Sequence, residues 1–273
     1  MVGRTVVITG ASDGIGAAAA RELSRRGDEV VVVGRSAEKT AAVAAEIAAD
    51  SFTADFARLD DVRELAAQLL ARYPRIDVLA NNAGGLMGPR EETVDGHEKT
   101  FQVNHLAPFL LTMLLSDRLA ESRATVIATS SVAHRLYSDF DIDDLESRRR
   151  YRPELAYGNA KLENILFTRE LNKRFNDRGI SAAAFHPGVV ATSFSAGSRS
   201  GLRLMYRSVL NRFILPPEKG ADTLVWLATT TPGVDWESGG YFAKRKPARL
   251  KKGADDPALA AALWDRSSAM VKR

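Results

Sequence analysis

The sequence predicts an α/β fold, namely a single domain in which a doubly wound parallel β-sheet is flanked by helices. Short apolar or β-branched runs alternate with helical segments along most of the 273 residues, and this order is typical of βαβ units joined by right-handed crossovers. Residues 30–33 are continuously apolar, as expected for a parallel strand that is buried on both faces. No linker rich in proline, glycine and serine interrupts residues 1–273, so one domain is expected.

The amino-terminal half opens with the β-branched run 5–9, which predicts the first strand. A glycine-bearing turn follows, and the next segment, 17–26, is predicted to be a helix that ends at Gly27. Apolar runs and helical spacing predict the other elements of this half. They are a strand at 30–33, a helix over 37–49, a strand at 51–54, a helix over 59–73 and a strand at 76–80.

The carboxyl-terminal half continues the alternation. Apolar residues at helical spacing predict two long helices, over 98–119 and 156–176. Between and after them, β-branched or apolar runs predict strands at 125–129 and 181–185. A helix over about 218–228 and a last strand near 239–242 complete the expected order.

Composition restricts the classes of function. The chain has no cysteine, which excludes a disulfide framework, thiolate metal ligands and a cysteine nucleophile. The chain enters its first strand too early for a signal peptide, so a cytoplasmic location is expected. No apolar run reaches the roughly 18 residues that a membrane-spanning helix needs.

The net charge of +4 is unevenly distributed. Residues 1–198 carry 24 Lys and Arg against 27 Asp and Glu, whereas residues 199–273 carry 14 against 7. A nucleic-acid-binding domain would show a basic stripe over its body. Because the excess of positive charge belongs to the last quarter of the chain, no nucleic-acid partner is expected.

Three glycines, Gly10, Gly14 and Gly16, follow the first strand and open the first helix. Such a turn bends sharply, lets the backbone approach a pyrophosphate, and places phosphates at the positive helix amino terminus. The spacing G-x-x-x-G-x-G differs from the G-x-G-x-x-G of most dinucleotide folds. A plain glycine-rich turn therefore remains an alternative.

The end of the second strand bears on the form of the cofactor. An acidic residue there would bind a ribose 2′-hydroxyl, but the chain has Gly34-Arg35-Ser36. Arg35 favours a 2′-phosphate, and hence NADP(H) over NAD(H), although a solvated surface arginine is the alternative. Asp13 in the glycine turn weakens this preference slightly because it would repel a nearby phosphate.

Tyr157 and Lys161 lie four residues apart, on one face of a predicted helix. A phenol has a pKa near 10, and a neighbouring ammonium lowers it by favouring the phenolate. The pair therefore has the chemistry of an acid/base catalyst. Taken alone, it could equally be a surface pair.

Together these motifs resemble those of the short-chain dehydrogenase/reductase family, which has a Rossmann fold. The motifs that carry the resemblance are Thr9-Gly10-Ala11-Ser12-Asp13-Gly14-Ile15-Gly16, Asn81-Asn82-Ala83-Gly84, Asn104, Ser130-Ser131, Tyr157 with Lys161, and Pro187-Gly188. The resemblance runs from about residue 4 to the carboxyl-terminal helix. It is greatest to the retinol-dehydrogenase-like branch that prefers NADP(H), on segments such as Phe101–His105 and Ser130–His134.

The resemblance implies a catalytic set. Tyr157 would be the general acid or base, Lys161 would lower its pKa and hold the nicotinamide ribose, and Ser131 would donate to the substrate oxygen. Asn104 would hold a water that links Lys161 to bulk solvent. The implied cofactor-binding residues are Gly10, Ser12, Asp13, Gly14, Ile15, Gly16, Arg35, Asp55, Asn82, Ala83, Gly84, Tyr157, Lys161, Pro187, Gly188, Val190 and Thr192. Ser130 and all four histidines are interpreted as structural or rim residues, and no metal site is expected.

On the substrate side, the resemblance implies a lid over 194–216, followed later by a carboxyl-terminal tail at 244–273. Arginines alternate with apolar residues over 199–215, which predicts an amphipathic helix that closes over an apolar substrate. Weak peripheral contact with an anionic membrane is the alternative for this segment. The charged insertion 138–153 is expected to border the substrate entrance as a solvated face. Homodimers or homotetramers would form through the two long helices.

The sequence therefore predicts an NADP(H)-dependent oxidoreductase that interconverts a carbonyl and an alcohol on an apolar small molecule. Two alternatives stay open. The same fold could reduce a C=C or C=N bond, or the chain could be a non-catalytic NADP-binding regulator, because a fold does not fix a function. Regulators usually lose the tyrosine or the lysine, and this chain keeps both.

Overall fold

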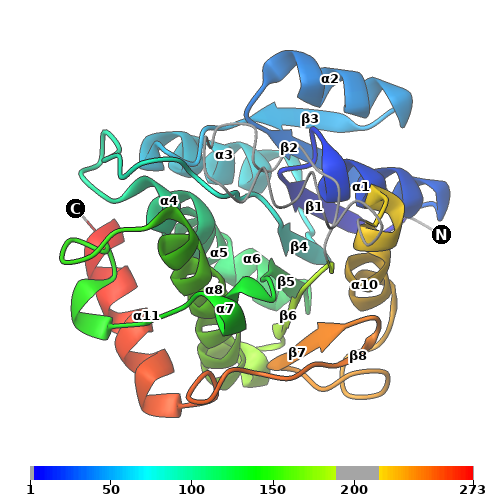
Figure 1. Ribbon diagram of the computed structural model, residues 1–273. Coiled ribbons are helices and arrows are strands. Elements are labelled where there is room, and N and C mark those ends of the chain that lie inside the picture. The colour runs from blue at the N-terminus through cyan, green and yellow to red at the C-terminus, as the bar shows by residue number, and fades with distance from the viewer. Residues whose placement is uncertain (1–2, 189–214, 273) are drawn as a thin grey trace.

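The computed structural model describes residues 3–188 and 215–272. Its centre is an eight-stranded sheet in the order β3-β2-β1-β4-β5-β6-β7-β8 (Figure 1). The strands are β1 (Thr5–Thr9), β2 (Glu29–Gly34), β3 (Asp50–Thr53), β4 (Val78–Asn81), β5 (Thr125–Thr129), β6 (Ser181–Phe185), β7 (Gly240–Ala243) and β8 (Lys246–Pro247). The first seven are parallel, and β8 pairs with β7 antiparallel.

Helices cover both faces of the sheet (Figure 1). On one face lie α1 (Gly14–Arg25), α2 (Ala37–Glu46) and α10 (Pro217–Thr229), and their apolar side chains form one core with β1 and β2. On the other face lie α3 (Leu59–Arg72), α5 (Ala107–Leu114), α8 (Pro153–Phe175) and α11 (Pro257–Val271), around a second core. The predicted doubly wound α/β fold is therefore confirmed.

The order of the strands fixes the position of the site. β1 has β2 on one side and β4 on the other, so the direction of winding reverses between β1 and β4. In open parallel sheets, ligands bind outside the carboxyl ends of the strands at such a reversal. The segments that leave β1, β2, β4 and β5 at this edge contain most of the residues that the sequence singles out.

The prediction of one long helix over 98–119 is wrong. The segment consists of α4 (Lys99–Phe101), a π-helical turn η1 (Gln102–Leu106), α5, and α6 (Ser116–Glu121). The amphipathic spacing continues through the segment, but a π-turn inserts an extra residue into the hydrogen-bond ladder. This turn carries Asn104, so the irregularity falls on a candidate catalytic residue.

Several short elements complete the fold. They are α7 (Ala133–Leu136), a 3-10 turn η2 (Ile142–Asp144) and a 3-10 turn η3 (Asn176–Arg178). The expected tail at 244–273 contains β8 and α11. Asp256 caps the first turn of α11, because its Oδ1 accepts from Ala258 N at 2.8 Å and from Leu259 N at 3.3 Å. Nearly all of the expected lid, 194–214, lies outside the described residues. Among the described helices, none has the length and hydropathy required to cross a membrane.

Candidate active site

The glycine turn packs closely against the end of β4. Gly10 and Gly14 have φ values of +65° and +55°, which glycine adopts at little cost. A Cβ on Gly10 would lie 2.7 Å from Ala83 Cα, and one on Gly16 would lie 2.6 Å from Asn82 Nδ2. Side chains at these positions would push the turn away from β4. The glycines therefore set the close approach between the turn and the strand.

Hydrogen bonds hold the same two segments together. Asn82 N and Ala83 N both donate to Thr9 Oγ1, at 3.0 Å each. Asn82 Nδ2 donates to the carbonyl oxygens of Thr9 at 3.0 Å and Gly10 at 3.3 Å. Asn82 thus links the ends of β1 and β4 through its backbone and its side chain. Thr9 is a partner that sequence reasoning did not single out, although it begins the glycine motif.

The amino terminus of α1 lies within the glycine turn. Asp13 is the N-cap, and its side chain accepts from Gly14 N at 2.7 Å. The first N–H groups of a helix have no carbonyl in a preceding turn, and they favour negative charge. Ser12 and Ile15 beside them are half-buried. This turn therefore fits the diphosphate of a dinucleotide.

Arg35 leaves the end of β2 with an exposed side chain. Among residues 3–188 and 215–272 it forms no ion pair or hydrogen bond through its guanidinium. Lys39, in the first turn of α2, lies with its Nζ 3.8 Å from Asp13 Oδ2. Lys39 therefore brings a second cation toward the glycine turn, a feature that the sequence prediction missed.

Tyr157 and Lys161 lie side by side on α8 and both are buried. Lys161 Nζ is 5.4 Å from the centroid of the Tyr157 ring and donates to the carbonyl oxygen of Thr129 at 3.0 Å. Desolvation by burial lowers the pKa of Lys161 to about 7. Asn164, three residues after Lys161, donates to the same Thr129 oxygen at 3.1 Å. The structure thus brings the predicted pair together and fixes its ammonium against β5.

Asn104 approaches Lys161 from the π-turn, next to Gly84. It is fully buried, and its Oδ1 accepts from Gly85 N at 3.0 Å, while Nδ2 donates to Gly85 O at 3.0 Å and Thr100 O at 2.9 Å. A Cβ on Gly84 would lie 2.5 Å from Asn104 Oδ1 and 3.1 Å from Lys161 Nζ. Asn104 and Lys161 therefore meet beside Gly84, which is itself a predicted site residue.

The two serines after β5 differ in their surroundings. Ser130 is buried and its hydroxyl donates to the carbonyl oxygen of Lys161 at 2.7 Å, which is a structural contact. Ser131 is half-buried, and its Oγ accepts from Ala133 N at 3.2 Å. That bond directs the Ser131 hydroxyl proton away from the amide. Ser131 is thus the serine with the geometry of a donor.

An apolar wall lies beside Tyr157. Leu86, Ala133 and Tyr157 form a buried cluster against which Tyr137 packs. Leu136, next to Tyr137, is 63% exposed. The wall borders the site on the side of the insertion 138–153, and His97 Nδ1 holds that insertion through Glu146 Oε1 at 2.7 Å. Much of the insertion's charged surface is exposed, with pairs such as Arg149 and Asp141.

The remaining predicted residues are more dispersed. Asp55 follows β3, and its Oδ1 accepts from Ala57 N at 3.0 Å. Pro187 and Gly188 follow β6, where Gly188 has a φ of +85° and donates from its N–H to His186 Nδ1 at 3.2 Å. Val190 and Thr192 lie outside the described residues. The described part of the chain contains no group of three or more histidine, aspartate or glutamate side chains arranged to hold a metal.

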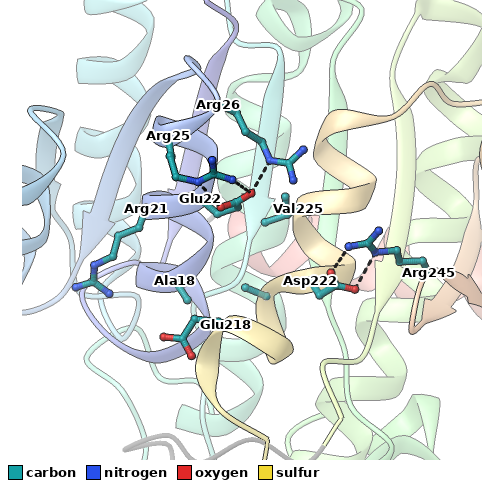
Figure 2. A pocket seen from close by; sticks show the side chains of 10 residues that line it. Ala18, Arg21, Glu22, Arg25, Arg26, Glu218, Asp222, Val225 and Arg245 are labelled. Carbon is teal, nitrogen blue, oxygen red and sulfur yellow. Dashed lines mark hydrogen bonds and ion pairs between the residues drawn. The ribbon is translucent and has the colours of Figure 1, made fainter.

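A surface hollow of about 320 Å³ lies elsewhere, between α1 and α10 (Figure 2). It contains none of the predicted site residues. Most of its charged groups are paired: Glu22 binds Arg25 and Arg26, and Asp222 binds Arg245 (Figure 2), while Arg21 pairs with Glu46 outside the hollow. Because these charges are engaged with other side chains and the predicted residues lie elsewhere, the candidate active site remains at the carboxyl edge of the sheet.

Comparisons with known proteins agree with this geometry. The family model "short chain dehydrogenase" matches residues 4–203. The chain is 45% identical to the "Putative daunorubicin C-13 ketoreductase DnrU" of Streptomyces sp. (strain C5), over 98% of this chain and 93% of that protein. It is 39% identical to retinol dehydrogenase 12 of Mus musculus, over 98% of this chain and 86% of that protein.

The fold is also similar to that of a solved structure. The Pseudomonas aeruginosa RhlG/NADP active-site complex superposes with a TM-score of 0.70 at 27% identity, covering 88% of this chain and 94% of that one. The family model and the relatives cover most of the chain, including the segments that carry the glycine turn and the Tyr157–Lys161 pair. The chain therefore belongs to the short-chain dehydrogenase/reductase family, as an oxidoreductase that resembles the retinol dehydrogenases.

Proposed function

We propose that the protein interconverts a carbonyl and an alcohol on an apolar small molecule, with NADP(H) as its cofactor and Tyr157 as general acid or base. The observation that carries the proposal is that Lys161 lies beside the Tyr157 ring on α8 and meets Asn104 next to Gly84. Ser131 leaves the adjacent strand at the same edge. A phenol, an ammonium, a hydroxyl and an amide together suffice for carbonyl reduction if a hydride donor is bound.

The residues present fit a nicotinamide dinucleotide. The amino terminus of α1 would hold the diphosphate, and the Asn82–Gly84 segment, held to β1, would line the adenosine side. Lys161 would hold ribose hydroxyls. Asp55, at the end of β3, would bind the adenine amino group. When bound, the cofactor supplies or accepts the hydride.

In the direction of reduction, Tyr157 would donate its phenolic proton to the substrate oxygen as negative charge develops there. Ser131 would donate a second hydrogen bond to the same oxygen and stabilise that charge. Lys161 would favour the resulting phenolate, and Asn104 would hold the water through which the proton is replaced. In oxidation, the same groups would act in reverse.

The preference for NADP(H) rests on charge at the end of β2. Arg35 and Lys39 are both exposed cations within reach of the α2 amino terminus, where Ser36 is the N-cap. A ribose 2′-phosphate would accept from a guanidinium in a bidentate manner. The NADP complex among the solved relatives is consistent with this preference.

An apolar substrate is favoured by the wall of Leu86 and Tyr137 beside Tyr157. The similarity to a putative ketoreductase and to a retinol dehydrogenase favours a carbonyl or alcohol over a C=C or C=N bond. A non-catalytic regulator is disfavoured because Tyr157, Lys161 and Ser131 all remain. Cytoplasmic location and weak membrane contact through 199–215 remain predictions.

The test is a substrate panel of apolar aldehydes, ketones, enones and imines, followed by NADPH absorbance. We expect the wild type to consume NADPH with aldehydes or ketones. Tyr157→Phe should lower kcat by about 10²- to 10⁴-fold. The matched control is Tyr137→Phe, which keeps the aromatic wall and removes a phenol outside the proposed proton path. Full activity of Tyr157→Phe would overturn the assignment of the acid.

A further inference from the structure

The helix α11 covers a face that the sequence prediction reserved for another subunit. It lies along α8 beside α5 (Figure 1). Trp264 stacks on Phe167, with ring centroids 5.8 Å apart at 14°, and meets Phe109 edge-on at 5.1 Å. The guanidinium of Arg174 lies 5.0 Å from the Trp264 ring centroid. The apolar seam between α5 and α8 is therefore filled by the chain itself.

Polar contacts fix α11 along its length. Arg174, on α8, pairs with Asp265 at 3.3 Å. Arg63, on α3, donates to the carbonyl oxygen of Val271 at 2.8 Å. Arg266 forms an ion pair with Asp143 in η2. These contacts tie α11 to three elements of the body, so it is an integral part of this layer.

One contact reaches the π-turn that carries Asn104. Ser267, on α11, is fully buried, and its Oγ lies 2.9 Å from His105 Nε2. Desolvation lowers the pKa of His105 to about 3, so the imidazole is neutral at physiological pH. The His105 ring is packed between Phe101 at 5.5 Å and Phe109 at 6.2 Å. Asn164 on α8 is another polar side chain beside the ring, and Ser267 is the polar partner that α11 supplies.

His105 and Asn104 are consecutive residues within η1. A π-turn has one more residue than an α-turn and is uncommon because its intrinsic stability is low. Such a turn persists where the surrounding structure determines it. The Asn104 side chain is bound on one side through Gly85 and Thr100. The Ser267–His105 contact supplies a tie on the other side.

We propose that α11 is an intramolecular brace, which closes the α5–α8 face in place of a partner subunit and holds the Asn104 turn through the Ser267–His105 contact. Ser267 and His105 are positioning residues and touch no reacting atom. The consequence for activity rests on the proposed function, because it assumes that Asn104 takes part in proton supply. The consequences for the mass in solution and for the hydrogen exchange of backbone amides do not depend on the proposed function.

The first experiment compares Ser267→Ala with Ser268→Ala. Ser268 is the adjacent residue of α11 and is half-buried, so its variant matches the change in size and helix propensity. Hydrogen exchange of the amides in 102–106 is measured in the full chain. We expect Ser267→Ala to accelerate exchange there by about 10-fold, with no change for Ser268→Ala. Equal exchange in both variants would overturn the brace.

The second experiment measures kinetics of the same variants. We expect Ser267→Ala to lower kcat by about 10-fold, with KM and the affinity for NADPH unchanged, because a misplaced proton-supply group affects the chemical step. Ser267→Thr, which keeps the hydroxyl, is expected to restore kcat in part. If KM also rose and NADPH binding also weakened, the variant would be damaged more generally, and this result would contradict a positioning role.

The third experiment is light scattering of the full chain over a range of concentrations. A brace that replaces a partner predicts a monomer of 29.7 kDa throughout. A stable dimer at low micromolar concentration would contradict the replacement. The measured mass and the hydrogen exchange of 102–106 test the brace even if the substrate panel shows no turnover. A failure of the brace can therefore be distinguished from a failure of the proposed function.

Discussion

Lys161 Nζ donates a 3.0 Å hydrogen bond to the carbonyl oxygen of Thr129, within a site from which water is largely excluded. Burial lowers the pKa of this ammonium to about 7, whereas in the unfolded chain it is near 10.5. An ammonium that titrates near neutrality can change its charge within the working range of pH. This relationship makes the stability of the cofactor-free protein depend on Lys161.

Lys161→Met is expected to change that dependence. Between pH 7 and 10.5 the unfolded chain holds a proton on Lys161 that the folded chain has released, so the wild-type unfolding free energy rises with pH through Lys161. Relative to Lys161→Met, the wild type should gain about 1 kcal/mol per pH unit across this window, and nothing below pH 7. Urea denaturation of both proteins without cofactor at pH 6, 7, 8 and 9 measures it. A constant difference across these values would refute the assignment.

Ser131→Ala is expected to lower kcat by about 10²- to 10³-fold, because it removes a donor to the developing oxyanion. NADPH affinity should stay unchanged, since Ser131 is proposed to bind the substrate oxygen. Ser130→Ala is the matched comparison. Its hydroxyl bonds the carbonyl of Lys161 in the core, so it should mainly lower the melting temperature. If the two variants exchanged these phenotypes, the choice of serine would be wrong.

Arg35 and Lys39 are expected to select the 2′-phosphate. Arg35→Leu and Lys39→Gln should each weaken NADPH binding by about 10-fold, as expected for the loss of one charge-assisted bond. NADH binding should stay within about twofold, which makes NADH the internal control. Cofactor fluorescence titration measures both, and displacement by 2′,5′-ADP isolates the phosphate. An equal loss for NADPH and NADH would show that these cations do not read the phosphate.

Asp13→Asn extends the same argument. The Asp13 carboxylate lies near Lys39 and at the amino terminus of α1, where it competes with cofactor phosphate for positive charge. Its replacement by asparagine keeps an N-cap acceptor. NADPH affinity should rise or stay equal, whereas a loss would mean that Asp13 itself binds the cofactor through its charge.

Much of the sheet could be predicted because most of its strands are runs of apolar or β-branched residues that lie between clear turn signals. Residues 5–9, 125–129 and 181–185 match their strands at both ends. The π-turn at Gln102–Leu106 could not be predicted, because the apolar spacing around it is the same as in a regular helix. Its extra residue is stabilised by contacts of Asn104 with Gly85, which are remote in sequence.

The candidate site divides in a similar way. The four-residue spacing of Tyr157 and Lys161 places them together on any helix, so local sequence is sufficient. The approach of Gly84 to both Asn104 and Lys161 depends on how β4, η1 and α8 pack. Lys39 and Ser267 belong to no recognisable motif. Their proposed roles follow from their contacts in the fold, with Asp13 and His105 respectively. Sequence patterns thus specify chemistry within one element, whereas convergence between elements requires the fold.

Glu163→Gln should stabilise the protein, most strongly above neutral pH. Glu163 is buried on α8 near a second buried carboxyl, Glu98, and desolvation with that charge raises its pKa well above 4.5. A raised folded-state pKa means that the contribution of Glu163 is favourable below about pH 4.5 and is lost progressively as pH rises toward the folded pKa. Glutamine keeps the shape and removes the titration.

The gain in unfolding free energy of Glu163→Gln should therefore increase from pH 5 to pH 8, measured by urea denaturation. Glu154→Gln, on the same helix but half-buried, is the matched control for replacing a glutamate of α8 by glutamine. Glu98 accepts hydrogen bonds from Thr100 N and Phe101 N, so Glu98→Gln would disturb the start of α4 and is a poorer comparison. A Glu163→Gln gain that is constant with pH would mean that Glu163 stays charged in the folded protein, which its burial beside Glu98 opposes.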